Sequence, residues 1–229
     1  MLEALKLAVL EANLELPKAG LVTLTWGNVS GRDPDSGLVV IKPSGVPYGA
    51  MTEQDMVVVD EDGTVVEGER RPSTDTPTHL VLYRGLRGVG GVVHTHSTWA
   101  TVWAQANRPI PLLGTTHADL CPGPVPVTVP LTPEQVGSGY EAATGDVILL
   151  AVSGRSAAEV PAVLVSGHGP FCWGASPAGA VGNAVTLEAV AKMAWLTVAL
   201  EPGATPLAGH VVERHFSRKH GPGAYYGQG

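Results

Sequence analysis

An apolar stretch that ends in two histidines constrains this chain more than any other feature. Residues 90–97 read Gly-Gly-Val-Val-His-Thr-His-Ser, and the β-branched pair after two glycines predicts a short buried strand. Side chains at i and i+2 of a strand share one face, about 6–7 Å apart, so His94 and His96 can reach one metal ion. A second apolar segment, residues 163–165, leads to His168 between two glycines. Three histidines with an open fourth position are typical of a catalytic zinc site.

A purely structural role is the alternative for these histidines. A lone histidine is more often a packed or surface residue than a metal ligand. The pair at 94 and 96 differs, because burying two unpaired imidazoles side by side would be costly. Their spacing therefore favours metal binding, and the Gly-His-Gly segment around His168 strengthens that interpretation.

Composition excludes several classes of protein. A chain of 229 residues with 44% hydrophobic and 15% charged residues is expected to form one packed core. A net charge of −7 without any basic run argues against a nucleic-acid surface. Cys121 and Cys172 form no CxxC pair, which indicates a reduced, cytoplasmic protein. The apolar run at residues 184–200 contains Glu188 and Lys192, so we expect an amphipathic helix and no membrane span.

Hydrophobic periodicity and turn residues predict the secondary structure. Short turns between the early strands indicate antiparallel pairing, and we expect an α/β fold with a central, largely antiparallel β-sheet flanked by helices. No internal repeat or long linker divides the chain, which predicts a single domain over residues 1–229. The expected helices are 2–16 (ended by Pro17), 78–86, 99–106, 177–200 and 206–216, and the expected strands are 21–26, 39–42, 57–59, 64–66, 92–93, 147–150 and 163–165.

Three turns carry small polar residues that suit phosphate binding. They are Gly27-Asn28, Ser44-Gly45 and residues 72–77, which include Ser73 and Thr74. Backbone amides, hydroxyls and the nearby Lys42 could together form a phosphate cradle. None of the turns matches a Walker A motif, and Ser73 or Thr74 could equally be an ordinary helix N-cap.

Two further polar residues lie in the segment 114–119, Gly-Thr-Thr-His-Ala-Asp. His117 could be a fourth metal ligand, and Asp119 could be an acid–base group. Both could equally be turn residues. The segment alone does not decide between these interpretations.

Seven separated segments together resemble the class II aldolase/epimerase family, and in particular its sugar-phosphate epimerases. The resemblance implies a single α/β domain with a largely antiparallel sheet, usually assembled as a cyclic tetramer. The segments are residues 21–30, 41–46, 72–79, 93–97, 114–119, 166–171 and 224–228.

The family resemblance also implies roles for particular residues. It assigns the metal, normally zinc with manganese as an alternative, to His94, His96 and His168, with Asp75 beside or on it. Asp119 and Tyr226 match an acid–base pair, and the Gly-rich tail 221–229 would carry Tyr226 to a neighbouring subunit. His215 matches a supporting histidine near that pair. The residues that match the substrate-phosphate pocket are Gly27, Asn28, Ser44, Gly45, Ser73 and Thr74, with Lys42 at its border.

The activity implied by the resemblance is interconversion of L-ribulose 5-phosphate and D-xylulose 5-phosphate, in arabinose or ascorbate breakdown. The C4–H of such a ketose is not acidic, so inversion needs retro-aldol cleavage of the C3–C4 bond and re-addition on the other face. Zinc would act as a Lewis acid, and the acid–base pair would supply one proton-transfer group on each face.

Two other functions compete with this interpretation. A class II aldolase that cleaves fuculose or rhamnulose 1-phosphate usually has a glutamate where this chain has Asp75. The shorter carboxylate favours the epimerase. A non-catalytic, adducin-like scaffold is the second alternative, and the intact histidines together with Asp119 argue against it.

Overall fold

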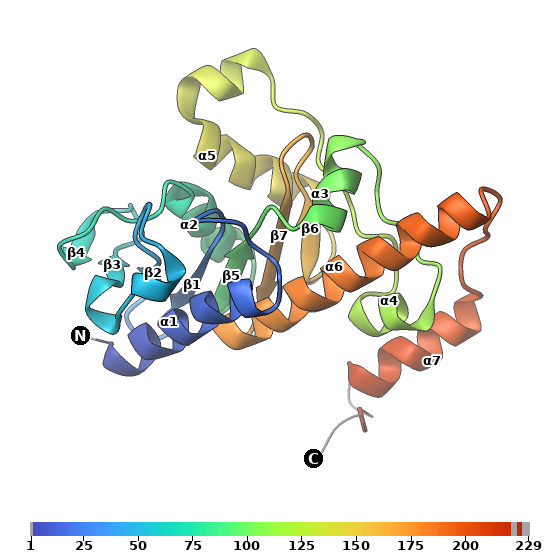
Figure 1. The fold of residues 1–229 in the computed structure, drawn as a ribbon, viewed down its shortest axis with the longest axis horizontal. Helices are drawn as coiled ribbons and strands as arrows, with labels where there is room; N and C mark the ends of the chain where they lie inside the picture. Colours follow the sequence, from blue (N-terminus) through green and yellow to red (C-terminus); the bar gives the residue numbers. More distant parts are fainter. Residues whose placement is uncertain (1, 221–223, 226–229) are drawn as a thin grey trace.

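A seven-stranded antiparallel sheet forms the centre of the computed structural model, which describes residues 2–220 and 224–225 (Figure 1). Its strand order is β4-β3-β2-β1-β5-β7-β6, and every pairing between these strands is antiparallel. This confirms the predicted fold class. The strands are β1 Asn28–Arg32, β2 Val39–Ile41, β3 Val57–Val59, β4 Val65–Glu67, β5 Gly91–His94, β6 Ala162–Leu164 and β7 Pro170–Gly174.

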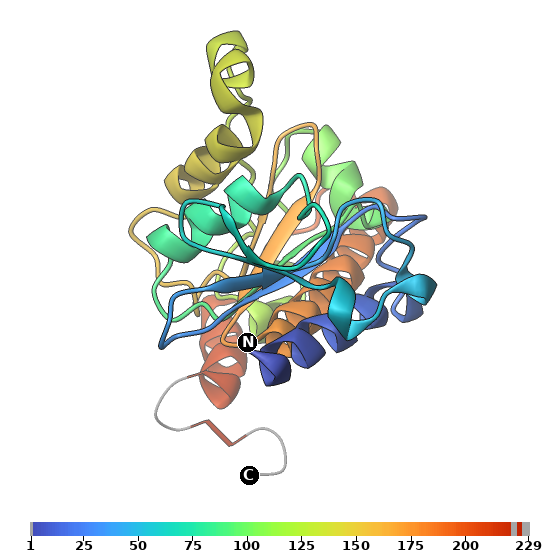
Figure 2. The same ribbon diagram turned by 90° about the vertical axis from the view of Figure 1, so that its left-hand side faces the viewer.

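Helices cover both faces of the sheet. α1 and α6 lie on one face, and α2 and α5 lie on the other (Figure 2). Successive side chains of a strand point to opposite faces of the sheet, and this alternation produces the two cores. Val93 lies in the core under α1 and α6, and Val92 lies in the core under α2 and α5. The α-helices are α1 Glu3–Lys18, α2 Thr76–Gly85, α3 Thr98–Gln105, α4 Thr115–Leu120, α5 Pro133–Ala151, α6 Pro177–Leu200 and α7 Gly209–Lys219.

The middle of the sheet brings the histidine segments together. β5 pairs with β1 on one side and with β7 on the other. In this register, Asn28 lies opposite His94 on one side, and Phe171 lies opposite His94 on the other. The start of α6 packs tightly on the beginning of β5, where a Cβ on Gly91 would lie 2.4 Å from Ser176 O. Glycine at this position therefore permits the close approach of the helix to the strand.

The predicted strand at residues 147–150 is wrong. This segment belongs to α5, where Val147 and Ile148 are buried while Leu150 is 66% exposed. A short apolar run fits a half-buried helix as well as a strand, and its packing against α2 decides between them.

Other predictions at loops and helix ends are also corrected. Residues 21–26 form a loop in place of the predicted strand, with Leu24 at φ +54° and 75% exposed. Pro17 does not end the first helix, which continues to Lys18. Residues 114–119, for which turn residues were one of the alternatives, lead into the short helix α4. The hairpin of β3 and β4 and the helix from Pro177 are confirmed.

α6 is long and apolar enough, by length and composition alone, to cross a membrane. This is weak evidence, because the core helix of a soluble protein meets the same criterion. Here α6 packs along β5, β7, α1 and α3, and its Glu188 carboxylate accepts hydrogen bonds from the first turn of α3.

Candidate active site

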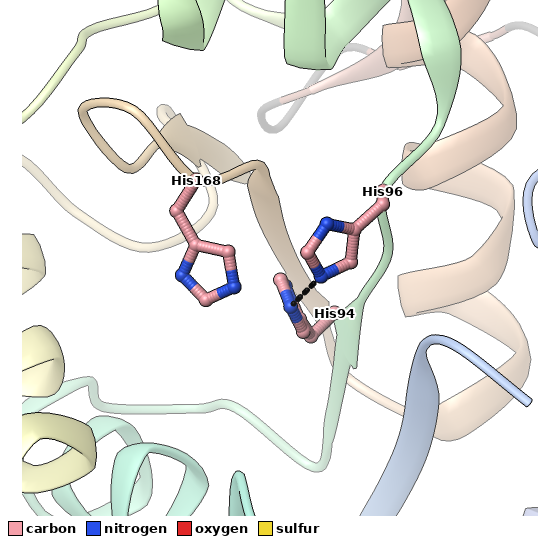
Figure 3. Close-up of side chains that lie close together, drawn as sticks. All are labelled: His94, His96 and His168. Atoms are coloured by element: carbon pink, nitrogen blue, oxygen red, sulfur yellow. Dashed lines mark hydrogen bonds between the residues drawn. The ribbon is translucent and has the colours of Figure 1, made fainter.

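Three histidines converge at one end of the central strands. His94 is the last residue of β5, His96 follows that strand, and His168 lies in the turn between β6 and β7. One ring nitrogen of each lies within 4.8 Å of the others, so the three can hold a metal ion. Figure 3 shows the rings directed toward one another from these segments. The pairing of β5 with β7 produces this convergence of residues far apart in the sequence.

The His94 and His96 rings are oriented as two ligands of one ion would be. His94 Nδ1 lies 3.0 Å from Pro170 O and donates to it, which directs Nε2 toward the other rings. His94 Nε2 and His96 Nε2 are 3.2 Å apart. Two nitrogens bound tetrahedrally at about 2.0–2.1 Å from zinc would be separated by about 3.3 Å. The donor set therefore fits a divalent metal.

Burial keeps these imidazoles in the neutral form that binds metals. Loss of solvent lowers the pKa of His94 to about 3. Burial also lowers the pKa of His96 and of His168 below the usual value for histidine. Near pH 7 the three rings are therefore neutral, and a metal need not displace protons from them.

Asp75 lies beside the three histidines. It immediately precedes α2, and its Oδ2 accepts a 2.6 Å hydrogen bond from Asn28 Nδ2. Burial by itself would raise the pKa of Asp75, but the nearby His94, His79 and Asn28 outweigh it, and the pKa is lowered. The carboxylate is thus held ionised next to the imidazoles, although it is not one of the three groups that lie within 4.8 Å of one another.

All the residues predicted for phosphate binding line one cleft with the histidines. Its volume is about 410 Å³. Within it, Asn28 Nδ2 donates to Ser73 Oγ at 3.0 Å. Gly27 has φ +91°, and a Cβ there would also lie 2.9 Å from His94 O, so both the backbone conformation and the close approach favour glycine. Polar side chains from segments far apart in the sequence thus converge. The lining residues are Thr25, Trp26, Gly27, Asn28, Lys42, Ser44, Gly45, Ser73, Thr74, Asp75, His94, His96, Tyr140, Glu141 and His168.

Lys42 provides a positive charge for this cleft. Its Nζ donates to Pro43 O at 3.3 Å and to Thr25 O at 3.5 Å, and it lies 5.2 Å from the Tyr48 ring centre. Burial lowers the pKa of Lys42, and the negative charge of Asp75 opposes that change. Because no carboxylate is within 4.0 Å of its ammonium group among the residues described, the lysine charge is available to an anionic ligand.

Asn28 has a buried acceptor without a partner. Its Oδ1 makes no hydrogen bond within the described part of the chain. A buried polar atom left in this state is costly, and a ligand hydroxyl could satisfy it. The unpartnered oxygen belongs to a residue that lines the same cleft as the histidines.

Sequence reasoning missed several residues of the cleft. Trp26, 54% exposed, lies with its ring centre 6.4 Å from that of His96. Tyr140 Oη is 3.2 Å from His168 Nδ1, and Glu141 follows it along the wall. No motif marked Tyr140, because a kink at Gly139 brings this part of α5 to the cleft.

Asp119 lies in a second polar cluster, formed by α4 and α7. Its carboxylate accepts hydrogen bonds from Arg218 at 2.6 and 3.0 Å and from His215 Nδ1 at 3.1 Å, and Lys219 Nζ is 3.8 Å away. Burial opposes ionisation, but Arg218 and His215 lower the pKa of Asp119 overall. His215 therefore lies beside Asp119. Neither residue lines the cleft of the three histidines.

His117, another predicted residue, does not line the cleft. His117 is buried, and its Nε2 donates to Gly123 O at 3.0 Å, so it is not a fourth ligand of this metal group. Burial lowers the pKa of His117 to about 4. Tyr226 and most of the tail 221–229 lie outside the described residues.

Comparison with known proteins gives close matches to sugar-phosphate enzymes. Proteins named L-ribulose-5-phosphate 4-epimerase UlaF, from Salmonella paratyphi A and Salmonella typhi, are each 54% identical over 227 residues, which is 99% of this chain and all of theirs. A solved L-fuculose 1-phosphate aldolase has a TM-score of 0.78 and 26% identity, covering 93% of this chain and 94% of its own. The l-fuculose-1-phosphate aldolase from Thermus thermophilus has a TM-score of 0.67 and 28% identity, covering 89% and 98%.

The family assignment rests on most of the chain. Residues 7–195 match the family described as Class II Aldolase and Adducin N-terminal domain. The matched region contains the whole sheet and all three histidines. The chain therefore belongs to the class II aldolase and adducin N-terminal domain family.

Proposed function

We propose that this protein is a metal-dependent epimerase that interconverts L-ribulose 5-phosphate and D-xylulose 5-phosphate. The main support is the 54% identity, over 99% of the chain, to proteins named L-ribulose-5-phosphate 4-epimerase. The cleft supports the same conclusion, because three neutral imidazoles lie with Lys42 and a set of small polar turns. We propose zinc as the metal, since three histidines and an open position suit it.

The cleft residues would bind the two ends of the substrate. Lys42, Asn28, Ser44, Ser73 and Thr74, with the backbone at Gly27 and Gly45, would hold the phosphate and keep the aldehyde fragment in place. A divalent metal on His94, His96 and His168 would act as a Lewis acid for the negative charge that develops on the other fragment.

Inversion at C4 would follow from cleavage of the C3–C4 bond. The C4 hydroxyl loses its proton as the bond breaks, giving glycolaldehyde phosphate and the enediolate of dihydroxyacetone. With its phosphate held, the aldehyde can turn its carbonyl over before the bond forms again. The new C4 alkoxide then takes up a proton on the opposite face, so one proton-transfer group is needed on each side.

Asp119 and Tyr226 would supply these two groups, with His215 beside Asp119. Asp119 does not line the cleft of its own chain, which favours a site completed by a neighbouring subunit. We therefore propose a homo-oligomer, a cyclic tetramer by analogy with the family, in which helix α4 and the tail meet a neighbour's histidines. Sugar phosphates are intracellular metabolites, which fits a cytoplasmic protein.

The direct test is incubation of the zinc-loaded protein with L-ribulose 5-phosphate. We expect D-xylulose 5-phosphate to form, and we expect L-ribulose 5-phosphate to form when D-xylulose 5-phosphate is supplied instead. Both activities should be lost when a chelator removes the metal. Release of dihydroxyacetone without epimerisation, or faster cleavage of L-fuculose 1-phosphate, would instead indicate an aldolase. A protein that retains no metal and acts on neither substrate would contradict both enzyme functions.

A further inference from the structure

The imidazoles of His94 and His168 differ in how their second ring nitrogen is held. His94 Nδ1 bonds a backbone carbonyl, Pro170 O, and the ring stacks on Phe171 with centroids 4.2 Å apart. His168 instead lies in the turn between β6 and β7, next to Gly167 at φ +68°. Its Nδ1 is 3.2 Å from Tyr140 Oη. His94 is therefore fixed by the sheet itself, whereas the His168 bond is to a side chain of a separate helix.

The direction of the Tyr140 bond follows from the chemistry of metal binding. A histidine that binds through Nε2 needs a lone pair there, which places its proton on Nδ1. His168 Nδ1–H would then donate to Tyr140 Oη. The tyrosine's own hydroxyl proton would remain free to point into the cleft, which Tyr140 also lines.

The backbone around Tyr140 is held by two hydroxyl groups. Thr144 Oγ1 donates to Tyr140 O at 2.8 Å, and Thr78 Oγ1, from α2, donates to Glu141 O at 2.6 Å. Just before them, Gly139 takes φ +150°, which interrupts the helix. The N-terminal part of α5 projects away from the sheet (Figure 1), but the residues after the kink are fastened to α2. Tyr140 thus begins the fastened part of the helix.

We propose that Tyr140 is a positioning residue for the metal ligand His168, and that α5 thereby contributes to how tightly the site retains its metal. The hydrogen bond fixes the tautomer and the ring orientation of a ligand that the sheet does not hold directly. Partners of this kind typically contribute about 10- to 100-fold in metal affinity or activity. The inference rests on the metal binding included in the proposed function.

The test is zinc affinity of the Tyr140→Phe protein, measured by competition with a chromophoric chelator. The substitution removes only a hydroxyl from a residue that is 36% exposed, so the fold should be kept. We expect the Kd for zinc to rise about 10- to 100-fold, and the thermal midpoint of the metal-free protein to stay unchanged. Ser138→Ala is the matched control, because it also removes a hydroxyl from α5. The Ser138 hydroxyl donates to Gln135 O, so its loss should leave the Kd for zinc as in the wild type.

A second measurement separates positioning from a general loss of stability. In the zinc-loaded protein, Tyr140→Phe should shift the Nδ1–H resonance of His168 and leave that of His94 in place. Equal zinc Kd values for wild type, Tyr140→Phe and Ser138→Ala, or an unshifted His168 resonance, would overturn the inference. Failure of the wild-type protein itself to bind zinc would overturn the proposed metal site, which is a different outcome.

Discussion

The two polar clusters of this molecule are built in different ways. The cleft cluster, defined by His94, His96 and His168, lies at the end of paired strands. The α4–α7 cluster, defined by Asp119, His215 and Arg218, is formed by side chains of two helices that contact each other. In the first, ring nitrogens lie within 4.8 Å of one another around an open centre. In the second, the carboxylate is already bonded to the basic groups beside it.

This difference matches what each kind of chemistry requires. A metal ion needs its ligands in fixed geometry, and strand register supplies that within one chain. A proton-transfer group needs only to reach the substrate, so a neighbouring subunit can deliver it. Under the proposed function, each chain would carry a metal and phosphate site and, apart from it, an acid–base group that serves a neighbouring copy.

Loss of a metal ligand should give the largest effect on the cleft cluster. In His96→Ala, two imidazoles remain, and we expect most of the bound metal and nearly all turnover to be lost. Metal content by mass spectrometry and epimerase assays would measure both. His210→Ala, which alters an exposed histidine of α7, is the control and should retain metal and activity. Full metal occupancy with normal turnover in His96→Ala would refute the assignment of the site.

Asp119→Asn should distinguish the role of the α4–α7 cluster in turnover from the role of the cleft cluster in metal binding. The amide cannot exchange a proton as the carboxylate does, so we expect kcat to fall by roughly 10²–10⁴. Metal content should remain as in the wild type, since Asp119 does not line the cleft. Steady-state kinetics and metal analysis on the same preparation test this. An unchanged kcat would mean that Asp119 only anchors α7 through Arg218 and His215.

Mixed oligomers would show whether the acid–base groups and the metal come from different chains. Tyr226→Phe and His96→Ala proteins should each be nearly inactive. If Tyr226 acts at a neighbour's metal, a hybrid will contain interfaces where an intact His96 meets an intact Tyr226, and activity should recover to a fraction of the wild-type value. Subunit exchange would be verified by native mass spectrometry. If hybrids with verified subunit exchange show no recovery of activity, Tyr226 and His96 act in the same site of one chain.

Much of the cleft could be predicted from the sequence because its residues follow strands and glycine-containing turns. The i, i+2 spacing of His94 and His96 and the glycines around His168 are local patterns. The phosphate residues could also be grouped, but only the family resemblance linked turns as distant as Gly27 and Ser73. The pairing of β1 with β5 brings Gly27 beside the histidines, and such long-range pairing leaves no local signal.

The errors occur where packing overrides local preference. Residues 147–150 are apolar enough for a strand, yet they form a helix because α5 packs on α2. The loop 21–26 has strand-forming residues but leaves Trp26 at the cleft, where Tyr48 Oη donates to Trp26 O at 3.0 Å. Tyr140 was missed because its position depends on a kink at Gly139. The spacing of these residues in the sequence does not predict tertiary contacts of this kind.

The smallest expected effect concerns α6, the helix that packs on both regions. α6 contacts β5 and β7 near the cleft cluster and also contacts α4. Its Glu188 accepts hydrogen bonds from Trp99 N at 2.8 Å and Ala100 N at 3.0 Å, so it caps the helix that begins just after His96. Ser97, the N-cap residue, provides no side-chain bond of its own. Glu188 therefore takes the place of a local cap.

In Glu188→Gln, one amide oxygen replaces two carboxylate oxygens and the negative charge at the helix N-terminus is lost. We expect the free energy of unfolding to fall by about 1 kcal/mol, as for loss of a capping group. Denaturant unfolding of the metal-free protein measures this, and Glu11→Gln on the exposed side of α1 is the matched control. Because α3 follows His96 directly, zinc affinity should weaken slightly, while the α4–α7 cluster should keep its contacts. A change in kcat as large as that of Asp119→Asn would mean that α6 couples the two regions, and that they are not independent half-sites.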